Sequence, residues 1–199
     1  MKIYDISQEL FSCVVFPGDP APAKETLNSM EKGDLYNLTA FSMCAHNGTH
    51  IDAPFHFINE GKRVDQLSLS KVIGMAYVAD FEGILSADDA RDILKRAARL
   101  SIESAKRILI KGKTTVSLEA AKVFSEAKID LIGNESQTVG PEDSPMEVHK
   151  VLLDVDAVLL EGVRLSRVPE GVYLLSAAPL NLAGAEGSPC RAVLIDLNT

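Results

Sequence analysis

The sequence predicts an α/β fold in which residues 1–199 form one compact domain, with a mixed sheet that carries helices. The chain has 199 residues, enough for one domain with a sizeable core and too few for two ordinary ones. Apolar residues make up 46% of the chain and charged residues 24%, as in an average globular protein. Short strand-like segments come first, and from about residue 72 they alternate with segments of helical spacing.

The part of the chain up to about Leu69 predicts short strands joined by loops. It is rich in Pro, Gly and Asn and has only short apolar runs. One of them, Val14–Phe16, leads into Pro17–Pro20, whose sequence Pro-Gly-Asp-Pro is a strong turn signal. No internal repeat, low-complexity tract or linker-like segment divides the chain.

The part after residue 72 predicts alternating strands and helices. Helix starts are indicated at Ser86 and Ser117, and a third helix is expected over residues 147–153. After Ser86, apolar residues such as Ile93 and Ala97 follow at helical spacing. Apolar runs indicate buried strands at residues 72–80, 107–110, 129–133, 155–160, 172–177 and 192–195.

Charge and hydropathy exclude several classes of protein. The formal net charge is -8 and no run of Lys or Arg offsets it, so the chain lacks the basic patch that binds nucleic acid. No apolar stretch reaches the roughly 18 residues of a membrane span. The first five residues lack the charged and apolar regions of a signal peptide. We therefore expect a cytoplasmic protein whose partner is a small molecule, with neither nucleic acid nor membrane as partner.

The three cysteines, Cys13, Cys44 and Cys190, do not predict a disulfide framework. Their number is odd, their spacings are wide and no CxxC pair occurs. Cys44 lies two residues before His46, so its thiol is either near a functional site or a small core residue, and we favour the core residue.

The most informative segment is His46–Phe57, which holds three of the four histidines. If residues 50–57 are extended, His50, Asp52 and His56 share one face and the opposite face is apolar. Such a crowding of imidazoles around a carboxylate favours a functional site over ordinary surface or core histidines.

Imidazole and carboxylate are the usual ligands of zinc, manganese or ferrous iron at hydrolytic sites. His46 stands four residues before His50, and Gly48 between them permits the sharp turn that would bring both rings to one ion. A catalytic metal ion has three protein ligands and one open position. The sequence therefore predicts a metal site with His46, His50 and Asp52 as its ligands.

His149 and Glu161 lie about a hundred residues further along the chain. Glu161 directly follows a strand that is expected to be buried, and a buried carboxylate needs a partner because an unpaired charge is costly in the interior. The spacing leaves two interpretations open: Glu161 binds a metal ion, or it ends the strand and reaches solvent.

These residues resemble a known family. The pattern His-x-Gly-Thr-His-x-Asp-x-Pro-x-His-Phe in His46–Phe57 is similar to the signature of the cyclase family of metal-dependent hydrolases, which includes the bacterial kynurenine formamidases (arylformamidases). The resemblance extends to both ends of the chain. It includes Ile3–Ser7 and Phe16–Pro20 near the N-terminus, and Leu165–Gly171 and Gly187–Ala192 near the C-terminus. The resemblance spans nearly the whole chain and implies the compact α/β fold of that family, usually assembled as a homodimer or tetramer.

The resemblance implies a role for each ligand candidate. His46, His50 and Asp52 match the first group of metal ligands, and His149 and Glu161 match the second. Asp52 and Glu161 are then able to bridge two ions. The implied cofactor is a divalent metal ion, with zinc first and manganese as the alternative, in one or two copies.

The resemblance also assigns His56 as the catalytic acid/base. The implied reaction is hydrolysis of an amide, formamide, cyclic imide or lactone carbonyl by metal-activated water. Two other functions stay open. One is a non-haem iron oxygenase, although such enzymes are mostly all-β barrels. The other is a non-catalytic member of the same fold that binds a metal or a small molecule, for which an acid/base residue at His56 is not needed.

The segment around Phe16 departs from the formamidase pattern. Formamidases of the family carry a Trp before the Pro-Gly-Asp turn, and this Trp packs on the aromatic substrate. This chain has no Trp, and Phe16 stands in that place. If Phe16 is a substrate-binding wall and not simply a core residue, its smaller ring predicts a preference for substrates smaller than N-formylkynurenine.

Overall fold

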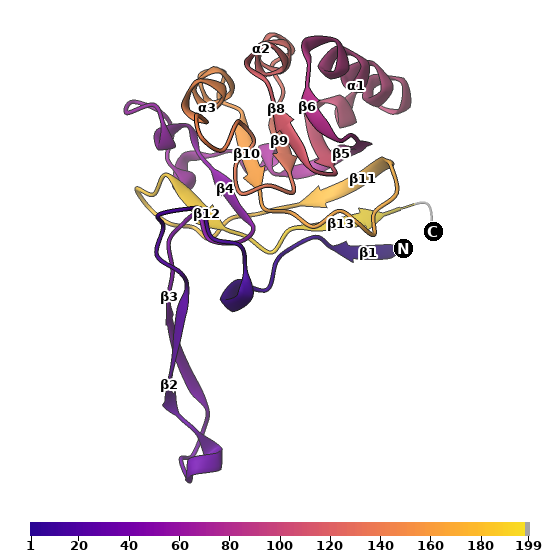
Figure 1. Cartoon of the computed structure of the whole chain (residues 1–199). Coiled ribbons are helices and arrows are strands. Elements are labelled where there is room, and N and C mark those ends of the chain that lie inside the picture. Colours follow the sequence, from indigo (N-terminus) through magenta and orange to yellow (C-terminus); the bar gives the residue numbers. More distant parts are fainter. Residues whose placement is uncertain (198–199) are drawn as a thin grey trace.

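The computed structural model describes residues 1–197 and has a nine-stranded mixed sheet at its centre (Figure 1). The predicted α/β class is confirmed. In spatial order the strands are β1 (Lys2–Asp5), β13 (Val193–Asp196), β11 (Gly171–Ser176), β5 (Ile73–Asp80), β7 (Arg107–Lys111), β9 (Leu131–Asn134), β10 (Val158–Glu161), β4 (His50–Asp52) and β12 (Gly187–Pro189).

Strands β5, β7, β9 and β10 run parallel to one another, and the remaining strands of the sheet are antiparallel to their neighbours. Figure 1 shows three helices over the parallel strands, and β11, β13 and β1 crossing beneath them. The helices are α1 (Ala87–Leu100), α2 (Leu118–Glu126) and α3 (Met146–Leu153). The curled sheet therefore has a separate apolar core on each face of its parallel strands.

The helices begin where the sequence predicts. Ser86 accepts a hydrogen bond from the Asp89 backbone N–H, and the Asp89 carboxylate accepts one from the Ser86 backbone N–H, so α1 starts with a capping box. Ser117 caps α2 by accepting a hydrogen bond from Ala120. Helix α1 buries its apolar side, including Ile93, against the sheet.

The predicted strands are confirmed, and two of them start later than predicted: β9 at Leu131 in place of residue 129, and β10 at Val158 in place of residue 155. The apolar run from residue 155 enters its strand only at Val158, because the chain first turns at Asp156. That residue has a left-handed φ of 66°, and its N–H donates to the Leu153 carbonyl at 2.9 Å. The short strands β6 (Gly83–Leu85) and β8 (Thr114–Val116) form a separate parallel pair.

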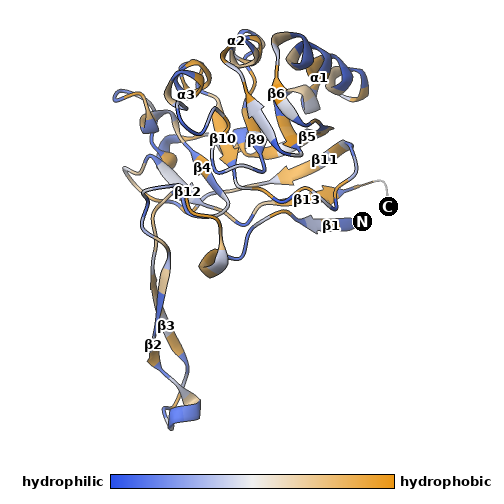
Figure 2. Ribbon diagram, in the orientation of Figure 1, coloured by the Kyte–Doolittle hydropathy of each residue, from blue (hydrophilic) through white to orange (hydrophobic). Residues whose placement is uncertain are grey.

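A two-stranded ribbon of β2 (Ala23–Asn28) and β3 (Leu38–Ser42) projects far from the body of the protein (Figure 1). We call residues 23–42 the arm. The sequence predicts the short strands of this region but not their projection from the body of the protein. Figure 2 shows hydrophobic residues along the arm, and its exposed large apolar side chains are Leu27, Met30, Leu35, Tyr36, Leu38 and Phe41.

All three cysteines are free, so no disulfide holds the fold together. Among residues 1–197, no helix is both long enough and apolar enough to cross a membrane.

Candidate metal centre

Strand β4 places two polar side chains in the interior. It lies between β10 and β12, and its residues His50, Ile51 and Asp52 are all buried. Side chains alternate along a strand, so His50 and Asp52 share one face while Ile51 packs into the apolar core on the other. The register pairs His50 with Glu161 at the end of β10, which brings a second carboxylate to the same place.

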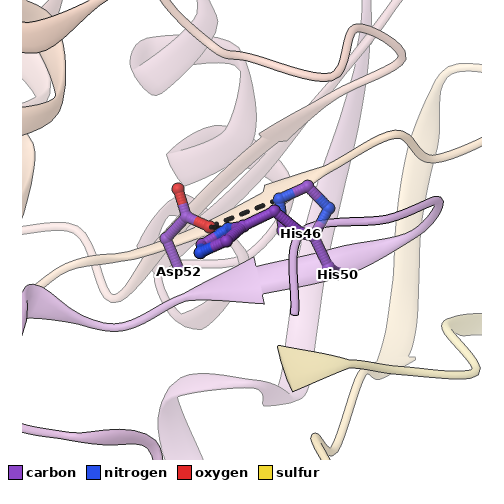
Figure 3. A group of neighbouring side chains, drawn as sticks. All are labelled: His46, His50 and Asp52. Atoms are coloured by element: carbon purple, nitrogen blue, oxygen red, sulfur yellow. Dashed lines mark hydrogen bonds and ion pairs between the residues drawn. The ribbon is translucent and has the colours of Figure 1, made fainter. Parts of the chain in front are cut away.

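The first cluster consists of His46, His50 and Asp52, as Figure 3 shows. The His46 Nδ1 lies 2.8 Å from the Asp52 Oδ1, and the His50 Nε2 lies 3.3 Å from the same oxygen. The His50 Nδ1 lies 3.0 Å from the Gly48 carbonyl. A carbonyl only accepts, so Nδ1 donates to it, and Nε2 is the ring nitrogen that faces the cluster.

The second cluster consists of Asp52, His149 and Glu161. The His149 Nε2 lies 3.2 Å from the Glu161 Oε1 and 3.6 Å from the Asp52 Oδ2. The His149 Nδ1 donates to the Pro145 carbonyl at 2.9 Å, so the tautomer is again fixed by a backbone acceptor. Glu161 is only 2% exposed, which excludes the alternative that it reaches solvent.

The clusters hold strongly interacting charges. Burial lowers the pKa of His50, but the adjacent Asp52 and Glu161 outweigh it and raise that pKa to about 10. Burial likewise lowers the pKa values of His46 and His149, and the neighbouring carboxylates raise both. Burial raises the pKa of Asp52, yet the imidazoles hold it well below its usual range. In the absence of metal, these pairs keep the carboxylate ionised and favour positive charge on the imidazoles.

The donors fit a divalent metal ion. Within residues 1–197, the buried His50 Nε2 and Asp52 Oδ2 make no hydrogen bond, although buried polar atoms normally have a partner. In each cluster the nitrogen and oxygen donor atoms lie within 4.8 Å of one another. Imidazole and carboxylate donors suit zinc and manganese, and a carbonyl on the second ring nitrogen is typical of a metal-binding histidine.

His56 lies next to the clusters but belongs to neither. Its ring stacks on that of His46, with 4.2 Å between centroids. Burial lowers the pKa of His56, and the nearby imidazoles of His46 and His149 lower it further, while Asp52 acts in the opposite direction. The ring is therefore neutral at pH 7 and able to accept a proton.

The expectation that residues 50–57 form one extended segment is wrong. Only His50–Asp52 is a strand, and Pro54–His56 form a 3-10 helix. Pro54 has no N–H for a sheet ladder, and its fixed φ suits the first position of a helical turn. The His56 N–H donates to the Ala53 carbonyl at 2.9 Å, and this turn brings the ring over His46.

A pocket of about 240 Å³ opens onto the clusters. Phe16 and Phe57 line it together with His56 and His149. Phe16 stands on the expected tight turn, in which the Asp19 N–H donates to the Phe16 carbonyl at 3.1 Å and Gly18 has a φ of 99°.

Gln137 is a pocket residue that the sequence analysis missed. Its Nε2 donates to the Gly48 carbonyl at 3.0 Å, and this carbonyl also accepts from His50. A usable signal exists in the sequence: Gln137 belongs to a polar stretch directly after the buried strand β9. Ligands of open α/β sheets often bind at the carboxyl ends of parallel strands.

Comparison with known proteins shows similarity over nearly the whole chain. The model of the putative cyclase family matches residues 4–141. The kynurenine formamidase of Erythrobacter litoralis (strain HTCC2594) is 32% identical over 98% of this chain and 94% of its own length. That of Bacillus anthracis is 34% identical over 97% of both chains. A solved structure described as a potential metal-dependent hydrolase with cyclase activity has a TM-score of 0.80 at 26% identity, over 97% of this chain and 96% of the other.

The fold, the buried ligand clusters and these similarities define a metal-dependent hydrolase. Within that class, the chain belongs to the putative cyclase family. The resemblance inferred from the sequence is thus confirmed. The alternative of a non-haem iron oxygenase is disfavoured, because the helices on a mixed sheet differ from the all-β barrel expected of such enzymes.

Proposed function

We propose that the protein hydrolyses the carbonyl of a small amide, formamide, cyclic imide or lactone at a centre of two divalent metal ions. The observation that carries the proposal is the pair of buried clusters that share Asp52, with His56 beside them in the pocket. The relatives named kynurenine formamidase support a substrate with a C–N bond. In this proposal His46, His50 and Asp52 hold one ion, and Asp52, His149 and Glu161 hold the other.

A bound divalent cation supplies Lewis acidity at the substrate carbonyl and activates water. The chain supplies the remaining parts of the mechanism. His56 accepts the proton of the attacking water at its neutral imidazole and returns it to the leaving group. Phe16 and Phe57 form apolar walls that orient the substrate and exclude bulk water. We propose zinc as the native ion, with manganese as the alternative, since imidazole and carboxylate ligands suit both.

The direct test is a hydrolysis screen on protein of measured metal content. The panel contains formamides, cyclic imides and lactones, each assayed with Zn²⁺, with Mn²⁺ and after treatment with a chelator. We expect turnover that the chelator abolishes and one of the ions restores. Metal-loaded protein that hydrolyses no member of the panel would favour the non-catalytic alternative.

A substitution at the pocket wall tests the substrate class. We expect Phe16→Trp to raise kcat/KM for N-formylkynurenine relative to smaller amides, cyclic imides or lactones, because a larger ring adds contact with an aromatic substrate. An aromatic pair contributes about 0.5–1.5 kcal/mol beyond burial, which is roughly a two- to tenfold change. The measurement compares kcat/KM for both substrate classes in the two proteins. A natural protein that already prefers N-formylkynurenine to every smaller substrate contradicts the idea.

We also propose that the protein is a homo-oligomer, a dimer or tetramer, held in part by the arm. An isolated two-stranded ribbon is at best marginally stable in water, and Leu35 at the arm tip is 93% exposed. A cavity of about 560 Å³ at the arm base, lined in part by Phe41 and Leu180, offers apolar surface for a second copy.

The cytoplasm is the proposed location, since its reducing conditions suit three free cysteines.

The oligomer is tested by light scattering on the full chain. We expect the natural protein to have a mass of two or four chains, and Leu35→Asp to shift it toward one. Lys32→Asp changes a charged residue of the same arm and serves as the control, since it removes no apolar contact. A natural protein that is monomeric at micromolar concentration excludes the proposal.

A further inference from the structure

Glu186 lies beside His46, the histidine of the two clusters whose outer ring nitrogen makes no hydrogen bond among residues 1–197. The Glu186 Oε1 is 3.4 Å from the His46 Nε2. This nitrogen is buried and makes no hydrogen bond within residues 1–197. The other ring nitrogen, Nδ1, lies 2.8 Å from Asp52 and so faces the first cluster. His46 therefore presents Nδ1 to the cluster and Nε2 to Glu186.

The two other histidines of the clusters have the same arrangement with a different acceptor. The His50 Nδ1 donates to the Gly48 carbonyl at 3.0 Å, and the His149 Nδ1 donates to the Pro145 carbonyl at 2.9 Å. In both rings this bond fixes the tautomer and leaves Nε2 toward the carboxylates. Metal-binding histidines usually have such a partner, either a carbonyl or a carboxylate. Among residues 1–197, no carbonyl has this role for His46, and the Glu186 carboxylate lies 3.4 Å from its Nε2.

We propose that Glu186 is the positioning residue of His46: its carboxylate accepts a hydrogen bond from the Nε2–H and keeps the Nδ1 lone pair directed at the metal ion. The inference rests on the proposed metal centre. It extends that centre by a carboxylate from a segment that sequence reasoning did not associate with the site.

The backbone around Glu186 is held by the strand that carries the ligands. The Ala53 N–H donates to the Glu186 carbonyl at 2.8 Å, and Gly187 pairs with Asp52 in the ladder between β12 and β4. A Cβ atom on Gly187 would lie 2.5 Å from the Cε1 of His46 and 2.9 Å from its Nε2. The imidazole thus lies directly against Gly187, the residue that follows Glu186 in the chain.

The expected effect is on metal affinity. Loss of an outer partner of a metal-binding histidine weakens affinity by about 10- to 100-fold. The Glu186 side chain is 41% exposed and its contact with His46 is long, at 3.4 Å, so solvent weakens the interaction. We therefore expect the lower end of that range, about tenfold, for removal of the carboxylate.

The experiment measures the Kd of Zn²⁺ for the metal-free full chain by competition with a chromophoric chelator. We expect Glu186→Ala to bind about tenfold more weakly than the natural protein. Glu186→Gln should fall between the two, because its amide oxygen still accepts but lacks the charge that about doubles the strength of such a bond. Glu60→Gln, whose exposed carboxylate contacts Asn59 instead, is the charge-matched control and should bind as the natural protein does.

Thermal melting of the metal-free variants separates positioning from folding, and we expect all of them to melt as the natural protein does. Equal Zn²⁺ affinity in Glu186→Ala and the natural protein overturns the inference. A weakening that glutamine does not relieve, or that accompanies a lower melting temperature of the metal-free form, overturns it as well. These outcomes leave the metal centre standing. A natural protein that binds no Zn²⁺ contradicts the metal centre together with the role of Glu186.

Discussion

His56→Ala is expected to lose about 10²- to 10⁴-fold of turnover and to keep its metal ions, because general acid/base catalysis contributes a factor of that size. His56 lines the pocket but belongs to neither ligand cluster. Burial lowers the pKa of its imidazole, which keeps the ring neutral and ready to accept a proton at pH 7. The measurements are kcat on the best substrate of the screen and metal content per chain.

His50→Ala is the comparison variant, since His50 belongs to the first ligand cluster. It should lose metal as well as turnover. Free imidazole added to the assay should restore part of the activity of His56→Ala, because it replaces the missing proton acceptor, and none of the activity of His50→Ala. Unchanged turnover in His56→Ala would remove His56 from the mechanism, and full metal occupancy in a folded His50→Ala would remove His50 from the ligand set.

The sequence predicts much of the site because its main residues are close together in the chain. His46, His50 and Asp52 fall within seven residues, and strand alternation alone places two of them on one face. The prediction for His56 was wrong in its local structure, because Pro54 ends the strand and starts a helical turn. The ring reaches the site even so, since the turn folds it back over His46.

Residues that act through tertiary contacts were less predictable. His149 on α3 and Glu161 on β10 lie close together, and these two elements are consecutive in the chain. The pairing of β10 with β4 then places Glu161 opposite His50. Spacing alone leaves the role of Glu161 open. Gln137 and Glu186 reach the site only through loops after β9 and before β12. The sequence of the arm does not indicate that the arm projects from the body of the protein. A local pattern predicts a pair of strands, but not whether the rest of the protein covers that pair.

Asp52 carries the largest expected effect on the metal centre, because it is the one residue that both clusters share. Its Oδ1 lies near His46 and His50, and its Oδ2 lies 3.6 Å from the His149 Nε2. Removing the carboxylate takes a ligand from each proposed ion at once. We expect Asp52→Ala to bind neither ion, whereas His149→Ala keeps the first cluster intact and binds one.

Elemental analysis of metal per chain, after dialysis against a fixed Zn²⁺ concentration, distinguishes these variants: two ions in the natural protein, one in His149→Ala and none in Asp52→Ala. Loss of one partner of a buried ion pair costs about 3–5 kcal/mol, so Asp52→Ala risks unfolding. Asp52→Asn preserves the side-chain volume, and circular dichroism checks that it folds. Because its amide is a poor ligand for either ion, a folded Asp52→Asn protein that still binds two zinc ions would show that Asp52 does not link the two clusters.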